Sequence, residues 1–147
     1  MIYPKLGESP LAFFGGASLC AELGDFPQCL NDAPLLLPGG HSAIRGHIDR
    51  WLSDLRLVPR LMGEFDDGAL MKAFGQAGAG FFPGPAVRRD EICTRYNTRC
   101  IGVVYEIHEG FWAITAERRV VHPAIMTVME SARSALFPSI TQPVPTT

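Results

Sequence analysis

The sequence predicts an α/β fold in which helices cover both faces of a mostly parallel sheet. Short apolar runs that stop at Gly or Pro alternate along the chain with stretches of helical periodicity, and the links between them are short. This alternation is typical of strand–helix–strand units. The 147 residues suit a single domain, and a hydrophobic content of 47% is sufficient for a core.

Strands are predicted where short apolar runs are bounded by turn residues. The run PLAFF at 10–14 ends at two glycines, and the run LLL at 35–37 ends at Pro38–Gly39–Gly40. Four more runs follow the same rule and complete the predicted sheet, at 60–65 (RLMGEF), 79–82 (AGFF), 100–107 (CIGVVYEI) and 111–116 (FWAITA).

The clearest helix is predicted directly after Ser42, which is a good N-cap residue. Apolar residues then recur at helical spacing and form one stripe: Ile44, Ile48, Trp51, Leu52 and Leu55. A second helix is expected at 68–77, with Asp66 or Asp67 as its cap. Weaker patterns predict helices at 19–23, 85–96 and 122–136, and a flexible tail at 138–147.

Composition excludes several classes of protein. The net charge is -2 and the pI about 6.1, so the chain lacks the excess of positive charge that is typical of a DNA-binding domain. The four cysteines form no C-x-x-C pair, which argues against a zinc ribbon or a redox motif. The first residues hold no apolar signal segment, and no apolar run reaches membrane-spanning length. We therefore expect a cytoplasmic protein with free thiols that does not contact a membrane.

Two strand-to-helix junctions are candidates for ligand binding, because ligands of open α/β sheets bind where strands end and helices begin. The first junction holds Gly39, Gly40, His41 and Ser42. Its glycines allow a ligand to approach the backbone, and the helix start offers N–H groups to a carboxylate, a phosphate or an inorganic anion. The alternative is a plain glycine-rich turn with a serine cap, since the pattern matches neither the P-loop nor the dinucleotide fingerprint.

The second junction carries three carboxylates within four residues, Glu64, Asp66 and Asp67. Oxygen ligands of this kind suit a hard cation, and they also suit the amine of a ligand. The alternative is helix capping, because an acidic residue at a helix start is stabilised by the helix dipole. Capping accounts for one aspartate, so a metal site at all three residues stays as a hypothesis.

Catalysis is poorly supported by the sequence. Neither a G-x-S-x-G elbow nor an H-E-x-x-H pair occurs, and the four histidines are scattered. A small α/β enzyme that uses Cys93 or His41 is a weaker alternative, because the sequence identifies no general base beside the Cys93 thiol. We expect no enzyme activity, no catalytic residue and no cofactor.

Two long segments resemble a known family. They are GEFDDGALMKAFGQAGAGFFPGP at 63–85 and FWAITAERRVVHPAI at 111–125. Both are similar to the effector-binding region of LysR-type transcriptional regulators, in the branch of NhaR-like activators, and the similarity extends over about 6–137. The family fold is a type II periplasmic-binding-protein-like domain of two α/β lobes with the ligand between them. The resemblance implies that 11–107 is the second, three-layer Rossmann-like lobe and that 111–137 returns into a first lobe that is mostly missing, which makes the chain an incomplete domain.

The resemblance also implies a function, namely that of the ligand-sensing part of a transcriptional activator without its winged helix-turn-helix. DNA would then be contacted only through that missing N-terminal domain, and a homo-oligomer such as a dimer is expected. Asp66 matches the helix start that family members use at the effector, and the turn at 39–42 would lie near the same cleft. The effector is expected to be a small molecule or an ion, since NhaR-like members are associated with a sodium response. A free-standing binding or interaction module of the same fold is the alternative.

Overall fold

The computed structural model describes residues 5–112 together with Ala132 and Ala135. The chain divides into two compact units, Pro10–Ile107 on one side and Met1–Ser9 with His108–Thr147 on the other. Residues 113–116 of the strand expected at 111–116, the helix expected at 122–136 and the tail expected at 138–147 lie outside the continuous described segment.

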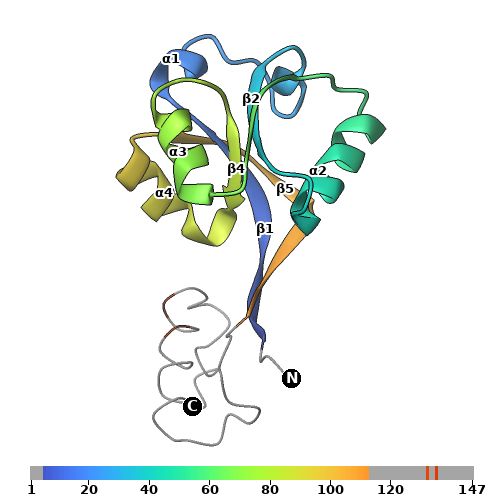
Figure 1. Cartoon of the computed structure of the whole chain (residues 1–147). Helices are drawn as coiled ribbons and strands as arrows, with labels where there is room; N and C mark the ends of the chain where they lie inside the picture. Colours follow the sequence, from blue (N-terminus) through green and yellow to red (C-terminus); the bar gives the residue numbers. More distant parts are fainter. Residues whose placement is uncertain (1–4, 113–131, 133–134, 136–147) are drawn as a thin grey trace, which may run out of the picture. The chain divides into compact units, whose positions relative to one another are not determined.

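Within residues 5–112, five strands form one three-stranded and one two-stranded sheet at the centre of the fold (Figure 1). β1 (Lys5–Gly15) lies between β4 (Phe82–Pro85) and β5 (Arg99–Trp112), while β2 (Pro34–Pro38) pairs in parallel with β3 (Arg60–Phe65). An isolated parallel bridge between Leu35 and Phe81 connects the two groups of strands. Because β1 pairs with β4 in the antiparallel sense, the sheet is mixed, and the expectation of a mostly parallel sheet is corrected.

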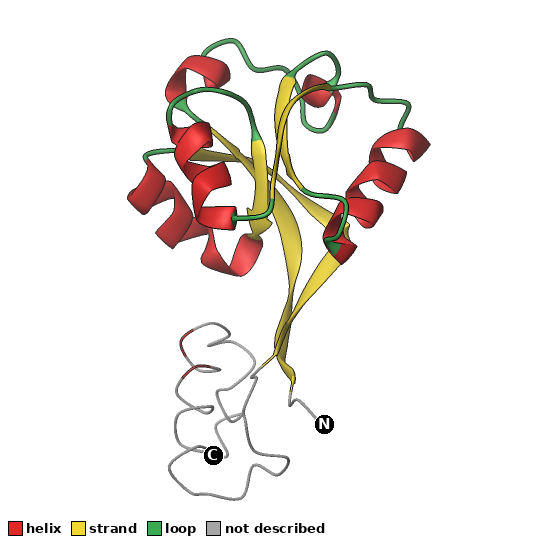
Figure 2. Ribbon diagram, in the orientation of Figure 1, coloured by secondary structure: helices red, strands yellow, loops and turns green. Residues whose placement is uncertain are grey.

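Helices cover both faces of this sheet and give the predicted three layers (Figure 2). One face carries α1 (Ala17–Cys20), the 3-10 turn η1 (Gln28–Leu30) and α2 (Ala43–Asp54). The other face carries α3 (Gly68–Gln76), η2 (Ala86–Arg88) and α4 (Arg89–Tyr96).

Alternation along the strands distributes side chains between two cores. On β1, Leu11 and Phe13 enter the core beneath α2, whereas Ala12 and Phe14 enter the core beneath α3 and α4. Successive side chains of a strand point to opposite faces, so a strand covered on both faces is apolar at every position. The continuous apolar runs of the sequence are therefore buried strands.

Several elements differ from the sequence prediction. The strand expected at 10–14 begins earlier, at Lys5, and the helix expected at 19–23 is the four-residue α1. The helix expected at 85–96 is divided into η2 and α4. β4 begins at Phe82 and includes Pro83 and Gly84, which had been expected to end the strand, because Leu11 to Phe14 of β1 pair with this segment. β5 is one continuous strand where two were expected. In α3 the apolar residues Leu70 and Phe74 are 50% and 47% exposed, while Met71 and Gly75 face the core.

Candidate functional site

The two predicted junctions lie side by side at the carboxyl edge of β2 and β3. Parallel pairing places Pro38 opposite Phe65, so the two strands end at the same level. The backbone N–H of Gly39 then donates to the carbonyl of Phe65 at 2.9 Å, which extends the pairing into the turn. The structure thereby brings the residues 39–42 next to the start of α3.

Gly39 and Asp66 are in close contact within this edge. A β-carbon on Gly39 would lie 2.7 Å from Oδ1 of Asp66, closer than side chains tolerate. Gly39 is buried, whereas Gly40, His41 and Asp66 are exposed. A glycine is therefore required at position 39 for the Asp66 carboxylate to occupy its position over the turn.

The start of α2 forms the second wall of this edge. Ser42 occupies the predicted N-cap position, and its backbone N–H donates to the carbonyl of Gly39 at 3.0 Å. Its hydroxyl makes no capping hydrogen bond, in contrast to the role expected from the sequence. The first N–H groups of a helix have no partner within the helix, so this edge combines donor groups with the Ser42 hydroxyl.

The three carboxylates of the second junction are used separately. Asp67 is the N-cap of α3 and accepts from the N–H groups of Ala69 at 2.9 Å and Leu70 at 3.4 Å. Glu64 pairs with a guanidinium, and Asp66 lies against Gly39. Among the described residues no group of three or more His, Cys, Asp or Glu side chains is arranged to hold a metal ion. The predicted cation site at Glu64, Asp66 and Asp67 is thus not assembled.

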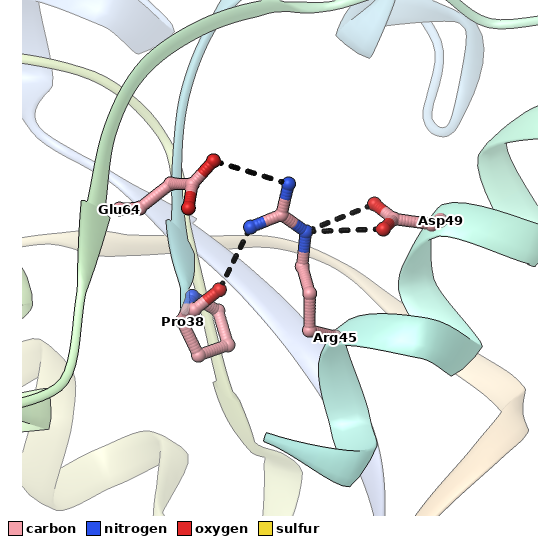
Figure 3. Close-up of polar contacts among 4 residues, drawn as sticks. All are labelled: Pro38, Arg45, Asp49 and Glu64. Atoms are coloured by element: carbon pink, nitrogen blue, oxygen red, sulfur yellow. Dashed lines mark hydrogen bonds and ion pairs between the residues drawn. The ribbon is translucent and has the colours of Figure 1, made fainter. Parts of the chain in front are cut away.

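Arg45 is the residue that connects the two junctions, and sequence reasoning missed it (Figure 3). One terminal nitrogen donates to the carbonyl of Pro38 at 2.9 Å, and the other lies 3.5 Å from Oε1 of Glu64. Its Nε lies 3.0 Å from Oδ1 of Asp49, one turn further along α2. Only 15% of the Arg45 side chain is exposed. The i, i+4 spacing to Asp49 is visible in the sequence, but the contacts with Pro38 and Glu64 depend on the fold.

The thiols do not resemble catalytic nucleophiles. Burial raises the pKa of Cys20, Cys29 and Cys93 above the ordinary value for a thiol, which disfavours the reactive thiolate. All four cysteines are free, as expected. His41 is exposed at the first junction, and Cys93 lies in α4, an element of the opposite face.

Comparisons with known proteins identify relatives over most of the chain. No family model matches the sequence. The chain is 37% identical over 112 residues to the transcriptional activator protein NhaR of Escherichia coli (strain K12). This match includes 76% of the chain but only 37% of NhaR, so the chain spans little more than a third of the length of this relative.

Solved structures of low sequence identity share the fold. The effector binding domain of QuiR in complex with shikimate matches with a TM-score of 0.63 at 13% identity, over 97% of this chain and 67% of that one. Full-length HypT from Salmonella typhimurium, a hypochlorite-specific LysR-type transcriptional regulator, matches with a TM-score of 0.63 at 18% identity, over 92% of this chain and 46% of that one.

The fold is that of an effector-binding domain of LysR-type regulators, as the resemblance implied. Within this class the sequence similarity is to NhaR, so the chain is an NhaR-like segment with the fold of a LysR-type effector-binding domain. These relatives are transcriptional regulators by name. In the part of the chain that the structure describes, every helix is too short or too polar to span a bilayer.

Proposed function

We propose that this chain is the part of a LysR-type regulator that binds a small polar effector at the carboxyl edge of β2 and β3. The junction site comprises Gly39, Gly40, His41, Ser42 and Asp66. The observation that supports it best is the close approach of the Asp66 carboxylate to the buried Gly39, beside the start of α2. Asp67, the neighbour of Asp66, caps α3 and so stabilises the helix start beside the site.

The chemistry of the junction site suits a ligand that carries both an acidic group and a hydrogen-bond donor. The start of α2 offers N–H groups and the Ser42 hydroxyl to a carboxylate or another anion. The Asp66 carboxylate accepts hydrogen bonds from a hydroxyl or an ammonium group. Hydroxy acids and amino acids combine these features, and the QuiR effector domain of the same fold was solved with shikimate.

The domain organisation, the contact with DNA and the oligomeric state are proposed by analogy with the relatives. The lobe expected at 11–107 holds the junction site. DNA is contacted by a winged helix-turn-helix outside this chain, and the working form is a cytoplasmic homo-oligomer. An ion effector remains part of the proposal, with Asp66 as the carboxylate that is not engaged by a cap or a guanidinium.

The test is a titration of the ¹⁵N-labelled chain, followed by amide chemical shifts. The probes are shikimate, a panel of other hydroxy acids and amino acids, and sodium chloride against choline chloride at equal ionic strength. A binding probe is expected to shift the amides of Gly39, Gly40, Ser42 and Asp66. Failure of every probe to shift these amides contradicts the proposal.

Two variants and one control sharpen the test. Asp66→Asn removes the acceptor charge, and Gly39→Ala displaces the Asp66 carboxylate, so both are expected to weaken binding about tenfold or more. Gly46→Ala is the matched control, because a β-carbon on this exposed residue of α2 meets nothing within 4 Å. Equal weakening by all three variants would point to a loss of folding instead of a loss of contacts.

A further inference from the structure

A cavity of about 710 Å³ lies between α2, β5 and the segment before η1. Its walls include the aromatic rings of Phe26 and Trp51 and the charged side chains of Arg50, Asp54 and Glu106. Small-molecule sites typically have volumes of roughly 300–1,000 Å³, with apolar walls and a few convergent polar groups. This cavity, named here the α2–β5 pocket, fits that description in both volume and lining.

The α2–β5 pocket is separate from the junction site. A helix turns by about 100° per residue, so Arg50 and Asp54 lie on the flank of α2 opposite to Arg45 and Asp49. The buried residues Ile48 and Leu52 lie between the two flanks. The junction site is at the first turn of α2, whereas the pocket is lined by its later turns.

The aromatic wall of the pocket is held in place by the core. The rings of Phe26 and Trp51 are stacked with centroids 6.1 Å apart, and Phe13, which is fully buried, stacks on Trp51 at 5.8 Å. A β-carbon on Gly102 would lie 2.2 Å from Cδ1 of Phe26, so the ring is seated directly on the backbone of β5. A wall fixed in this way offers a rigid apolar surface, which lowers the entropic cost of binding.

The charges of the pocket are not used by the fold. Within residues 5–112, Arg50, Asp54 and Glu106 take part in no ion pair. Two carboxylates and one guanidinium therefore line the pocket, together with the imidazole of His47. Counted with a neutral imidazole, the carboxylates exceed the guanidinium by one charge. Carboxylates in a pocket with aromatic walls favour an organic cation with an apolar body, because the carboxylates attract the charge and the rings offer apolar surface to the body.

We propose that the α2–β5 pocket binds a small organic cation with an apolar body. The ammonium group lies at the carboxylates of Asp54 and Glu106, and the apolar body lies on the rings of Phe26 and Trp51. This binding event is independent of the effector at the junction site, so a regulator of this kind would respond to two chemically different ligands.

Fluorescence of Trp51 provides the test. The chain holds two tryptophans, so Trp112→Phe leaves Trp51 as the single reporter. Benzyltrimethylammonium is the cationic probe, and benzyl alcohol and benzoate are neutral and anionic probes with the same ring. A saturable change in fluorescence and a rise in Tm are expected with the cation, with affinity at least about tenfold above that of benzoate.

Charge-neutral variants decide whether the carboxylates recognise the probe. Asp54→Asn and Glu106→Gln are each expected to weaken binding of the cation about fivefold to tenfold. Asp49→Asn is the matched control on the other flank of α2 and is expected to leave the affinity unchanged. Equal binding of benzoate, no saturable response to the cation, or equal weakening by Asp49→Asn would each overturn the proposal.

The oligomeric state and the junction site are monitored in the same samples. If light scattering shows a dimer whose dissociation is required before the probe binds, a second copy covers the pocket and the proposal fails. The amide shifts of Gly39 and Ser42 in hydroxy-acid titrations are expected to persist in Asp54→Asn. Failure at one site is therefore distinguishable from failure at the other.

Discussion

Two helical glycines are expected to respond in opposite ways to the same substitution. Gly46 lies in α2 and Gly75 near the end of α3. A β-carbon on Gly46 meets nothing within 4 Å, so Gly46→Ala is expected to stabilise the chain by about 0.5–1 kcal/mol through helix propensity. A β-carbon on Gly75 would lie 2.2 Å from Cδ1 of Phe82, which is far inside normal contact.

The size of the Gly75 effect follows from the position of Phe82. This ring is fully buried and stacks on Phe14 with centroids 5.6 Å apart, so it has no free direction in which to move. Overpacking of a filled core costs about 1–3 kcal/mol. The gain in helix propensity offsets part of this cost, and we expect Gly75→Ala to destabilise the chain by about 1–2 kcal/mol.

Urea denaturation followed by circular dichroism measures both variants against the parent chain. For a chain of this size the loss corresponds to a decrease in Tm of roughly 2–8 °C. The double variant Gly75→Ala/Phe82→Leu is expected to lose less than the sum of the single losses, because the smaller side chain makes room for the methyl group. If Gly75→Ala is as stable as the parent chain, the packing argument is wrong.

Three further predictions concern polar contacts. Arg45→Met is expected to cost about 1–3 kcal/mol in urea denaturation, because it leaves the Pro38 carbonyl and Glu64 without this partner, and Arg50→Met serves as the control. Asp67→Ala is expected to cost about 1 kcal/mol through loss of the α3 cap. Asp67→Asn should keep most of the stability that the cap contributes, because Asn is also a good N-cap residue. The hydrogen bond from Arg88 lowers the pKa of Glu91, so its contribution is present above the unfolded pKa and is lost as the pH falls through the folded pKa. Glu91 is about half exposed, so Glu91→Gln should cost under about 1 kcal/mol at pH 7, and this cost should disappear as the pH falls through the folded pKa of Glu91.

The sequence by itself determined the elements whose signals are local. The strand Arg60–Phe65 has the bounds predicted from its apolar run, and α2 begins directly after Ser42. Asp67, one of the two predicted caps, is the N-cap of α3. Periodicity, caps and turn residues act within a few positions of the chain, so they are legible without knowledge of the fold.

Only the tertiary structure decided which residues meet at the site. It separated three neighbouring carboxylates among a cap, a guanidinium and a close contact with Gly39, and it made Arg45 the link between two strand ends. It also shifted β4 onto residues that pair with β1, although some 70 positions separate the two strands. Contacts of this kind arise from the pairing and packing of distant segments, and no local pattern in the sequence encodes them.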